Sequence, residues 1–138
     1  MIVIDASVAV KWLIVEVGSE SATALLKSSE PLFAPDLMLV EVGGAVVRQA
    51  NERKIVRNDA STALARWAAV WGSGRLQTRR LEPALVTRAA ELALDLGHPL
   101  KDCIYLALAI DLGCALLTAD AKFQDRAADR YPDVRLLG

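Results

Sequence analysis

Two acidic residues directly follow short apolar runs. Asp5 comes after the β-branched residues 2–4, and Asp120 comes shortly after residues 114–118. Runs of this length are typical of buried strands. A carboxylate just beyond a strand is well placed for metal binding or acid–base chemistry, but an Asp there also commonly caps the next helix. The pattern therefore predicts either two residues of one site or two helix caps.

Two further carboxylates lie in segments that are otherwise apolar. Glu41 lies in residues 37–47, whose apolar side chains cover nearly every face and predict a buried helix. Gly43–Gly44 are unfavourable in a helix, so we expect another backbone to approach closely there. Asp102 opens the apolar residues 102–110. Glu41 needs a metal ion or a buried Arg as partner, whereas an acid at a helix N-terminus is also favoured by the helix dipole.

Together the four carboxylates predict a cation site. Crowded carboxylates repel each other, so some must bind a proton or share a cation. Mg²⁺ and Mn²⁺ prefer oxygen ligands, and two such ions can promote attack of water on a phosphodiester. Other chemistries find little support, because the sequence lacks a nucleotide-binding glycine loop and a serine-hydrolase motif. The single histidine, His98, precedes Pro99 and is expected to be a loop residue without partners.

The elements that must position these residues alternate between strand and helix. Mostly apolar runs predict strands at residues 2–4, 32–34, 114–118 and 134–137, and residues 75–78, which follow Gly72-Ser73-Gly74, are a further candidate strand. Periodicity and capping predict helices at residues 7–15, 19–28, 37–51, 58–71, 83–96, 100–112 and 121–130, with Ser7 and Asp36 as caps of the first and third. This alternation indicates an α/β fold with a mostly parallel sheet. Function is then expected beyond the carboxyl ends of the strands.

Length and composition fit one domain. The chain has 138 residues, 54% of them hydrophobic, and 16 Lys and Arg against 17 Asp and Glu. The near-zero net charge gives no support for a strongly basic nucleic-acid-binding domain. No apolar stretch is long enough to span a membrane and the N-terminus is unlike a signal peptide, so we expect a cytoplasmic protein. Cys103 and Cys114 are expected to be buried and unpaired.

Four blocks of the sequence resemble the PIN-domain ribonucleases, and most closely the VapC-type toxins of prokaryotic toxin–antitoxin pairs. The blocks are residues 3–13, 34–41, 102–109 and 117–123, in the order found in that family. The resemblance covers essentially the whole chain. It implies a single PIN domain over residues 1–138, with a central parallel five-stranded sheet flanked by helices.

The resemblance also implies roles for individual residues. Ser7 and Thr118 match hydroxyl positions that orient a carboxylate or a water, although capping by Ser7 and a strand-end role for Thr118 are equally compatible with the sequence. Lys101 departs from the family pattern, and Asp125 lies near a less regular acidic position where a solvated helix face is the better interpretation. The family has four acidic residues that bind metal and are catalytic, and the resemblance implies that these correspond to Asp5, Glu41, Asp102 and Asp120.

The resemblance implies a Mg²⁺- or Mn²⁺-dependent endoribonuclease with one or two ions, neutralised by a VapB-type antitoxin and forming homodimers. The RNA target, the ion and the antitoxin-contacting residues stay open. One alternative is a catalytically weak domain that acts by binding RNA or as a corepressor with the antitoxin. Another is a phosphotransfer enzyme with Asp5 as nucleophile, although the neighbouring positions lack the second Asp that such chemistry commonly uses.

Charge is unevenly distributed along the chain. Residues 48–80 contain eight cations and two acids, an excess of +6 that leaves −7 elsewhere. A basic flank beside an acidic metal site suits an RNA substrate, whereas solvated helix faces or antitoxin contacts are the alternatives. Trp12, Trp67 and Trp71 are candidates for partner interfaces or for helix packing.

Overall fold

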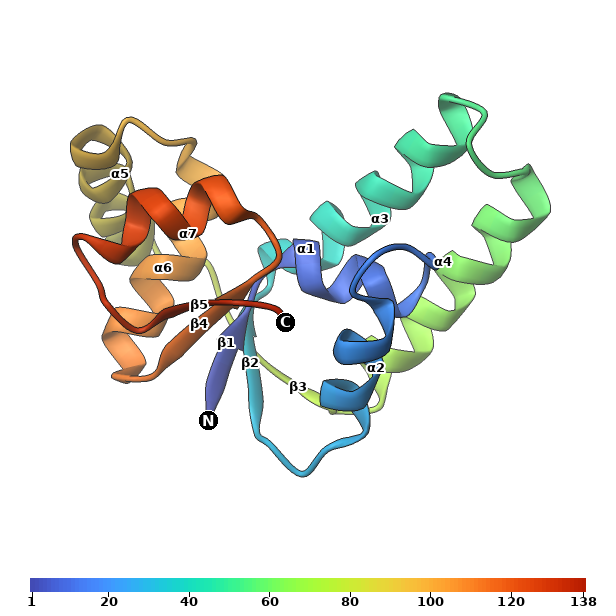
Figure 1. Ribbon diagram of the computed structural model, residues 1–138, viewed down its shortest axis with the longest axis horizontal. Helices are drawn as coiled ribbons and strands as arrows, with labels where there is room; N and C mark the ends of the chain where they lie inside the picture. Colours follow the sequence, from blue (N-terminus) through green and yellow to red (C-terminus); the bar gives the residue numbers. More distant parts are fainter.

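Five short strands form one parallel sheet in the order β3-β2-β1-β4-β5. The computed structural model describes all residues, 1–138, and its ribbon is shown in Figure 1. The strands are β1 (Ile2–Ile4), β2 (Leu32–Pro35), β3 (Leu76–Arg79), β4 (Ala115–Thr118) and β5 (Val134–Leu136). The predicted α/β class and five-stranded parallel sheet are therefore confirmed.

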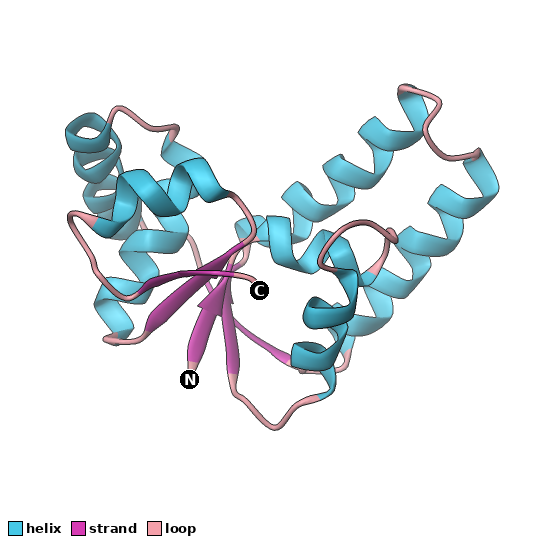
Figure 2. Ribbon diagram, viewed as in Figure 1, coloured by secondary structure: helices cyan, strands magenta, loops and turns pink.

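Helices surround this sheet, as Figure 2 shows. In that view α5, α6 and α7 gather on one side and α1 to α4 on the other, with the strands between them. No helix is long and apolar enough to cross a membrane. The helices are α1 (Ala6–Ala9), the 3₁₀ turn η1 (Val10–Trp12), α2 (Ser19–Lys27), α3 (Leu37–Asn51), α4 (Arg57–Gly72), α5 (Pro83–Leu96), α6 (Leu100–Leu112) and α7 (Ala121–Ala128).

The core lies where the central strands meet α6. All residues of β1 are buried, because parallel strands covered on both faces expose neither side. Residues 103–109 of α6 are also buried, and this helix packs against β1, β2 and β4. Both cysteines are buried and free, as predicted. The edge strand β3 buries only Leu76.

The direction of the chain through the sheet changes at β1. From β1 it moves outward through β2 to β3, and it then returns to form β4 on the other side of β1. The register pairs Ile4 with Leu117, so the carboxyl ends of β1 and β4 are adjacent. Ligands of open α/β sheets bind at such a switch point. Asp5 and Asp120 follow these two strands.

The first helix differs from the prediction. It begins at Ala6 with Asp5, not Ser7, as its cap, and the 3₁₀ turn that continues it ends at Trp12. Asp36 precedes α3 but its side chain makes no capping hydrogen bond. The other elements begin and end within two residues of their predicted limits.

The prediction that α3 is buried on all sides is wrong. Met38, Val42 and Val46 are buried, but the opposite face is open and Val40 is 73% exposed. The reason is that α3 packs along α4 in a hairpin that projects from the sheet (Figure 1). No backbone approaches Gly43–Gly44 closely, so the predicted tight contact is also absent.

Candidate active site

One cavity of about 660 Å³ opens between the two groups of helices. Its walls come from the end of β1, the side of α3, the start of α6 and the segment after β4. The lining includes all four predicted carboxylates, Asp5, Glu41, Asp102 and Asp120. The fold thus brings together residues that are up to 115 positions apart, from Asp5 to Asp120.

Asp5 is the most buried of these acids, with 5% of its surface exposed. The backbone N–H of Ser7 donates to Asp5 Oδ1 at 3.1 Å, and the Ser7 hydroxyl donates to the same oxygen in a short hydrogen bond. This is the cap of α1. Asp5 therefore caps α1 and still offers an oxygen to the cavity, because both capping contacts go to one of its two carboxylate oxygens.

Two hydroxyls connect the ends of β1 and β4. Ser7 Oγ accepts from the Ala119 N–H at 2.9 Å and lies 3.4 Å from Thr118 Oγ1. Thr118 Oγ1 in turn accepts from the Asp120 N–H at 3.1 Å, and Thr118 is fully buried. The hydroxyls therefore fix the backbone that carries the first and last carboxylates.

Burial raises the pKa of Asp5 from its ordinary value of 3.8 to about 6. The neighbouring charge of Asp102 raises this pKa further, whereas hydrogen bonds from the Ser7 and Thr118 side chains lower it. An ionised carboxylate in this position is thus unfavourable unless a cation accompanies it.

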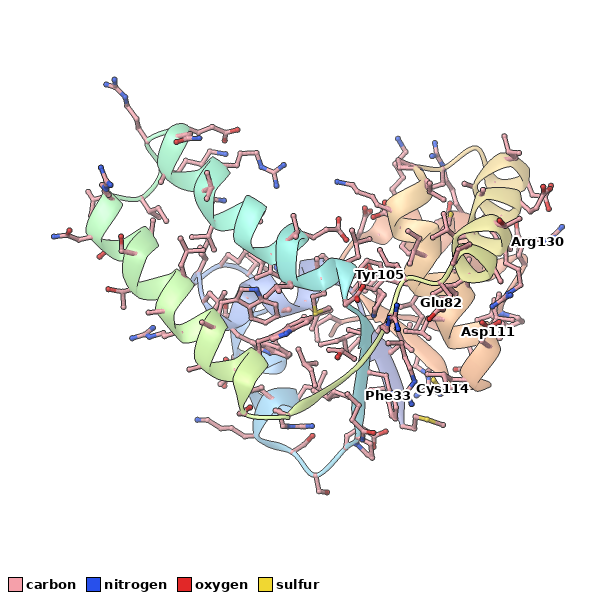
Figure 3. The ribbon with its side chains drawn as sticks, turned by 180° about the vertical axis from the view of Figure 1, so that it is seen from behind. Phe33, Glu82, Tyr105, Asp111, Cys114 and Arg130 are labelled. Carbon is pink, nitrogen blue, oxygen red and sulfur yellow. The ribbon has the colours of Figure 1, made fainter.

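Glu41 is held by Tyr105. The Tyr105 hydroxyl donates to Glu41 Oε1 at 2.7 Å, and the Lys101 ammonium lies 3.8 Å from Oε2. No arginine pairs with Glu41, so the buried Glu–Arg ion pair that the sequence offered as an alternative to a metal ion is not formed. Figure 3 shows Tyr105 in the centre of the molecule near the start of α3. Burial and the contact with Glu41 raise the pKa of Tyr105, which keeps its hydroxyl a donor.

Asp102 has a partner that the sequence prediction missed. His98 Nε2 lies 2.8 Å from Asp102 Oδ2, and 5% of the His98 side chain is exposed. The ring stacks on Phe123 with centroids 4.7 Å apart, and Arg126 Nη1 lies 3.2 Å from His98 Nδ1. The expectation of a loop histidine without partners is therefore wrong, because α7 packs over the loop.

Asp120 is the exposed member of the group. Its Oδ1 accepts from the backbone N–H groups of Lys122 and Phe123 at 3.0 and 3.1 Å, which caps α7. One ligand atom from each of His98, Asp102 and Asp120 falls within 4.8 Å of the others, close enough to share one cation. Capping again occupies only one oxygen of the carboxylate.

Three cations line the cavity, namely Lys11, Arg48 and Lys101. Lys11 is already engaged with Glu16 at 3.1 Å and with a backbone carbonyl. The other positive residues of the basic segment lie outside the lining. Arg75, for example, donates to four backbone carbonyls and so fixes the loop after α2. Only part of the predicted basic flank therefore faces the acidic cavity.

Two other groups of predicted residues lie outside the cavity. Asp125 is exposed on α7 and does not line it. Trp67 is buried and packs against Trp12 and Trp71, and its ring N–H donates to the Leu39 carbonyl. This arrangement favours the helix-packing interpretation of the tryptophans.

Two positional signals could have revealed the missed residues. His98 lies only four residues before Asp102, so a loop that turns directly into the helix can bring the two side chains together. Tyr105 lies in an apolar helix, and a buried tyrosine hydroxyl needs a hydrogen-bond partner. Arg126 gives no such signal, because its contact with His98 depends on how α7 packs.

The fold and this acidic cavity define a class of protein. The sequence matches the PIN domain over residues 2–129. The structure is similar to PAE2754 from Pyrobaculum aerophilum, with a TM-score of 0.73 and 17% identity over 99% of this chain and 88% of that one. The chain therefore belongs to the PIN-domain family.

Within that family the chain is similar to the VapC ribonucleases. It is 30% identical to ribonuclease VapC9 of Mycobacterium tuberculosis over 132 residues, which cover 96% of this chain and 95% of that protein. The structure also resembles M. tuberculosis VapC20, described as a sarcin-ricin loop cleaving toxin, with a TM-score of 0.70 and 18% identity over 98% of this chain and 99% of that one.

Proposed function

We propose that this protein is a metal-dependent endoribonuclease toxin that hydrolyses RNA phosphodiester bonds at the four-carboxylate cavity. The observation that supports it best is the convergence of Asp5, Glu41, Asp102 and Asp120 on one cavity at the switch point of the sheet. The names of the VapC relatives support the same activity.

The donor set fits a divalent cation. Asp5 is buried and no positive side chain contacts it, and the nearest cation to Glu41 is a largely exposed Lys101 at 3.8 Å. Oxygen-rich sites of this kind suit Mg²⁺ or Mn²⁺. We assign the ligand role to the four carboxylates, with one or two ions. Such an ion, when bound, makes water more acidic and stabilises negative charge on a phosphodiester.

The chain's own residues would prepare this site. Ser7 and Thr118 hold Asp5 and the backbone of Asp120, and Tyr105 holds Glu41. Each of these contacts leaves at least one carboxylate oxygen without a protein donor. Arg48 and Lys101 line the same cavity and are placed to contact the phosphates of an RNA strand.

An antitoxin partner is supported by the similarity to a toxin-antitoxin complex from Klebsiella pneumoniae, with a TM-score of 0.64 and 16% identity over 98% of this chain and 96% of that one. The exposed apolar face of α3, which includes Val40 and Val47, is suited to a protein partner.

We also expect a homodimer and a cytoplasmic location. Light scattering of the purified protein tests the dimer.

A second candidate function is binding without cleavage, either of RNA or of promoter DNA together with an antitoxin. It is favoured by the similarity to VapBC2 from Rickettsia felis, a structure described as bound to a promoter fragment, with a TM-score of 0.62 and 17% identity over 99% of this chain and 97% of that one. The acidic cavity has no evident use in this alternative.

The two candidates are separated by cleavage of RNA with matched variants. We expect Asp5→Asn, Glu41→Gln, Asp102→Asn and Asp120→Asn each to lower the cleavage rate at least about 100-fold and to relieve growth arrest. Asp125→Asn, on an exposed site outside the cavity, is the control and should behave as wild type. Full activity of Asp5→Asn would overturn the proposal, and RNA binding without cleavage in Mg²⁺ or Mn²⁺ would favour the second candidate.

A further inference from the structure

The only histidine of the chain is buried beside the candidate site and makes three specific contacts. Its Nε2 lies 2.8 Å from Asp102 Oδ2, and its Nδ1 lies 3.2 Å from Arg126 Nη1. The Phe123 ring stacks on it at an interplanar angle of 17°. A loop side chain with one face covered and both nitrogens occupied has a single orientation.

The partners also determine which nitrogen carries the proton. A guanidinium has only N–H donors, so Arg126 requires a lone pair on His98 Nδ1. The proton of the neutral ring is then on Nε2, which faces a carboxylate oxygen that can only accept when ionised. Both contacts are satisfied by the same tautomer. In this tautomer Nε2 has no lone pair to offer to a metal ion.

We propose that His98 is a positioning residue for Asp102: it donates from Nε2 to Oδ2 and so directs Oδ1 toward the cation site. The inference rests on the proposed metal-binding role of Asp102. It assigns His98 to the support of a ligand, although its position beside Asp102 and Asp120 would also allow direct coordination. Hydrogen bonds to ligating carboxylates orient them and raise the affinity for the metal.

Helix α7 provides the other contacts that hold His98 in place. Arg126 also donates to the Gly97 carbonyl at 3.1 Å, which ties the helix to the loop that holds His98. Phe123 and Arg126 follow Asp120 on the same helix. The element that contributes the exposed carboxylate therefore also fixes the ring that orients Asp102. Removal of Arg126 should consequently weaken the site without touching a carboxylate.

The first test reads the tautomer directly. Because the chain has one histidine, ¹⁵N-labelled histidine in protein without an affinity tag gives the ring signals of His98 alone. We expect a protonated Nε2 and an unprotonated Nδ1, both in chelator and in saturating Mg²⁺. Loss of the proton from Nε2 when Mg²⁺ is added would show that His98 is a ligand, and a neutral ring with its proton on Nδ1 in chelator would remove the proposed donor. Either result would overturn the inference.

The second test measures Mg²⁺ affinity by calorimetry in His98 variants. We expect His98→Ala to weaken Mg²⁺ binding about 10-fold or more. His98→Gln should recover much of that loss, because its amide nitrogen reaches the position of Nε2 and donates as well. His98→Asn is too short to reach Asp102 and should resemble His98→Ala. This Gln–Asn comparison decides the matter even if the Ala variant does not fold.

A control arginine and a second metal make the test specific. Arg126→Ala should weaken Mg²⁺ binding, whereas Arg130→Ala should not, since Arg130 pairs with Asp95 on the outer side of the molecule (Figure 3). We expect His98→Ala to lower Mg²⁺ and Mn²⁺ affinity by the same factor. A loss confined to Mn²⁺ would indicate a direct nitrogen ligand. Unchanged affinity in His98→Ala would refute a positioning role.

Failure of the inference is distinguishable from failure of the proposed function. If wild type binds Mg²⁺ and cleaves RNA while His98→Ala binds Mg²⁺ equally well, only the role of His98 is wrong. If wild type binds neither Mg²⁺ nor Mn²⁺ and does not cleave RNA with either ion, the proposed function is wrong, and the tautomer of His98 then reports a structural hydrogen bond only.

Discussion

Replacement of Asp5 by Asn should stabilise the protein when no metal is present. Asp5 is buried beneath the cavity, and burial together with the charge of Asp102 raises its pKa to about 6. The folded state therefore disfavours the ionised form. Asn has nearly the same shape, keeps an oxygen that accepts from Ser7, and carries no charge.

The size of this effect follows from the pKa. A rise from 3.8 to about 6 corresponds to about 3 kcal/mol of unfavourable free energy once the group is ionised. Because the pKa of Asp5 is higher in the folded state, its contribution is most favourable below pH 3.8 and is lost as the pH rises through 6. The advantage of Asp5→Asn should thus be near zero at about pH 3 and about 3 kcal/mol at about pH 7.5.

Chemical unfolding and thermal unfolding in chelator at several pH values measure this difference. At pH 7.5 the melting temperature of Asp5→Asn should exceed that of wild type by roughly 10 °C. The control Asp125→Asn, exposed on α7, should stay within about 0.5 kcal/mol of wild type. Mg²⁺ should stabilise wild type more than Asp5→Asn. A difference that does not change with pH, or a less stable Asp5→Asn at pH 7.5, would refute the reasoning.

Three other substitutions have defined outcomes. Tyr105→Phe removes the hydroxyl that donates to Glu41. It should lower the free energy of unfolding in urea by about 1–2 kcal/mol and weaken Mg²⁺ binding in calorimetry about 10-fold. No change in either quantity would contradict the role of this hydrogen bond. Gly44→Ala should stabilise the protein by about 0.5–1 kcal/mol, because no atom outside the local helix backbone lies within 4 Å of the added methyl group. A loss of stability in the same unfolding experiment would show a hidden clash. Arg48→Ala should weaken RNA binding and reduce the slope of log affinity against log salt concentration by about one, the value for one lost phosphate contact. Lys54→Ala, outside the cavity, should change neither. Both are measured in Ca²⁺ to prevent cleavage.

Much of the fold follows from local sequence patterns. Strands β1, β2 and β4 are short apolar runs, and Gly97 and Gly113 end α5 and α6 in the left-handed conformation that favours glycine. The failures concern packing. The apolar residues of α3 resemble those of a buried helix, but one face is left open because the α3–α4 hairpin projects from the sheet.

The site was predictable in its charges but not in its supporting contacts. A carboxylate in an apolar context is visible in the sequence, so Asp5, Glu41 and Asp102 could be selected without coordinates. The contacts of His98 with Phe123 and Arg126 could not be predicted, because they depend on α7 covering the loop before α6. Tyr105 lies in the same apolar helix as many core residues, and only the structure shows that its hydroxyl reaches Glu41.

The central claim is that the four carboxylates act as one metal-dependent hydrolytic site on RNA. The most direct test is the cleavage rate of labelled RNA by chelator-treated protein as Mg²⁺ is added back, with Asp102→Asn in parallel. Our account predicts no cleavage in chelator, a saturable return of cleavage in wild type alone, and products with linear phosphate ends, because water is the nucleophile. Cleavage in chelator, equal cleavage by Asp102→Asn, or products ending in 2′,3′-cyclic phosphate would contradict it.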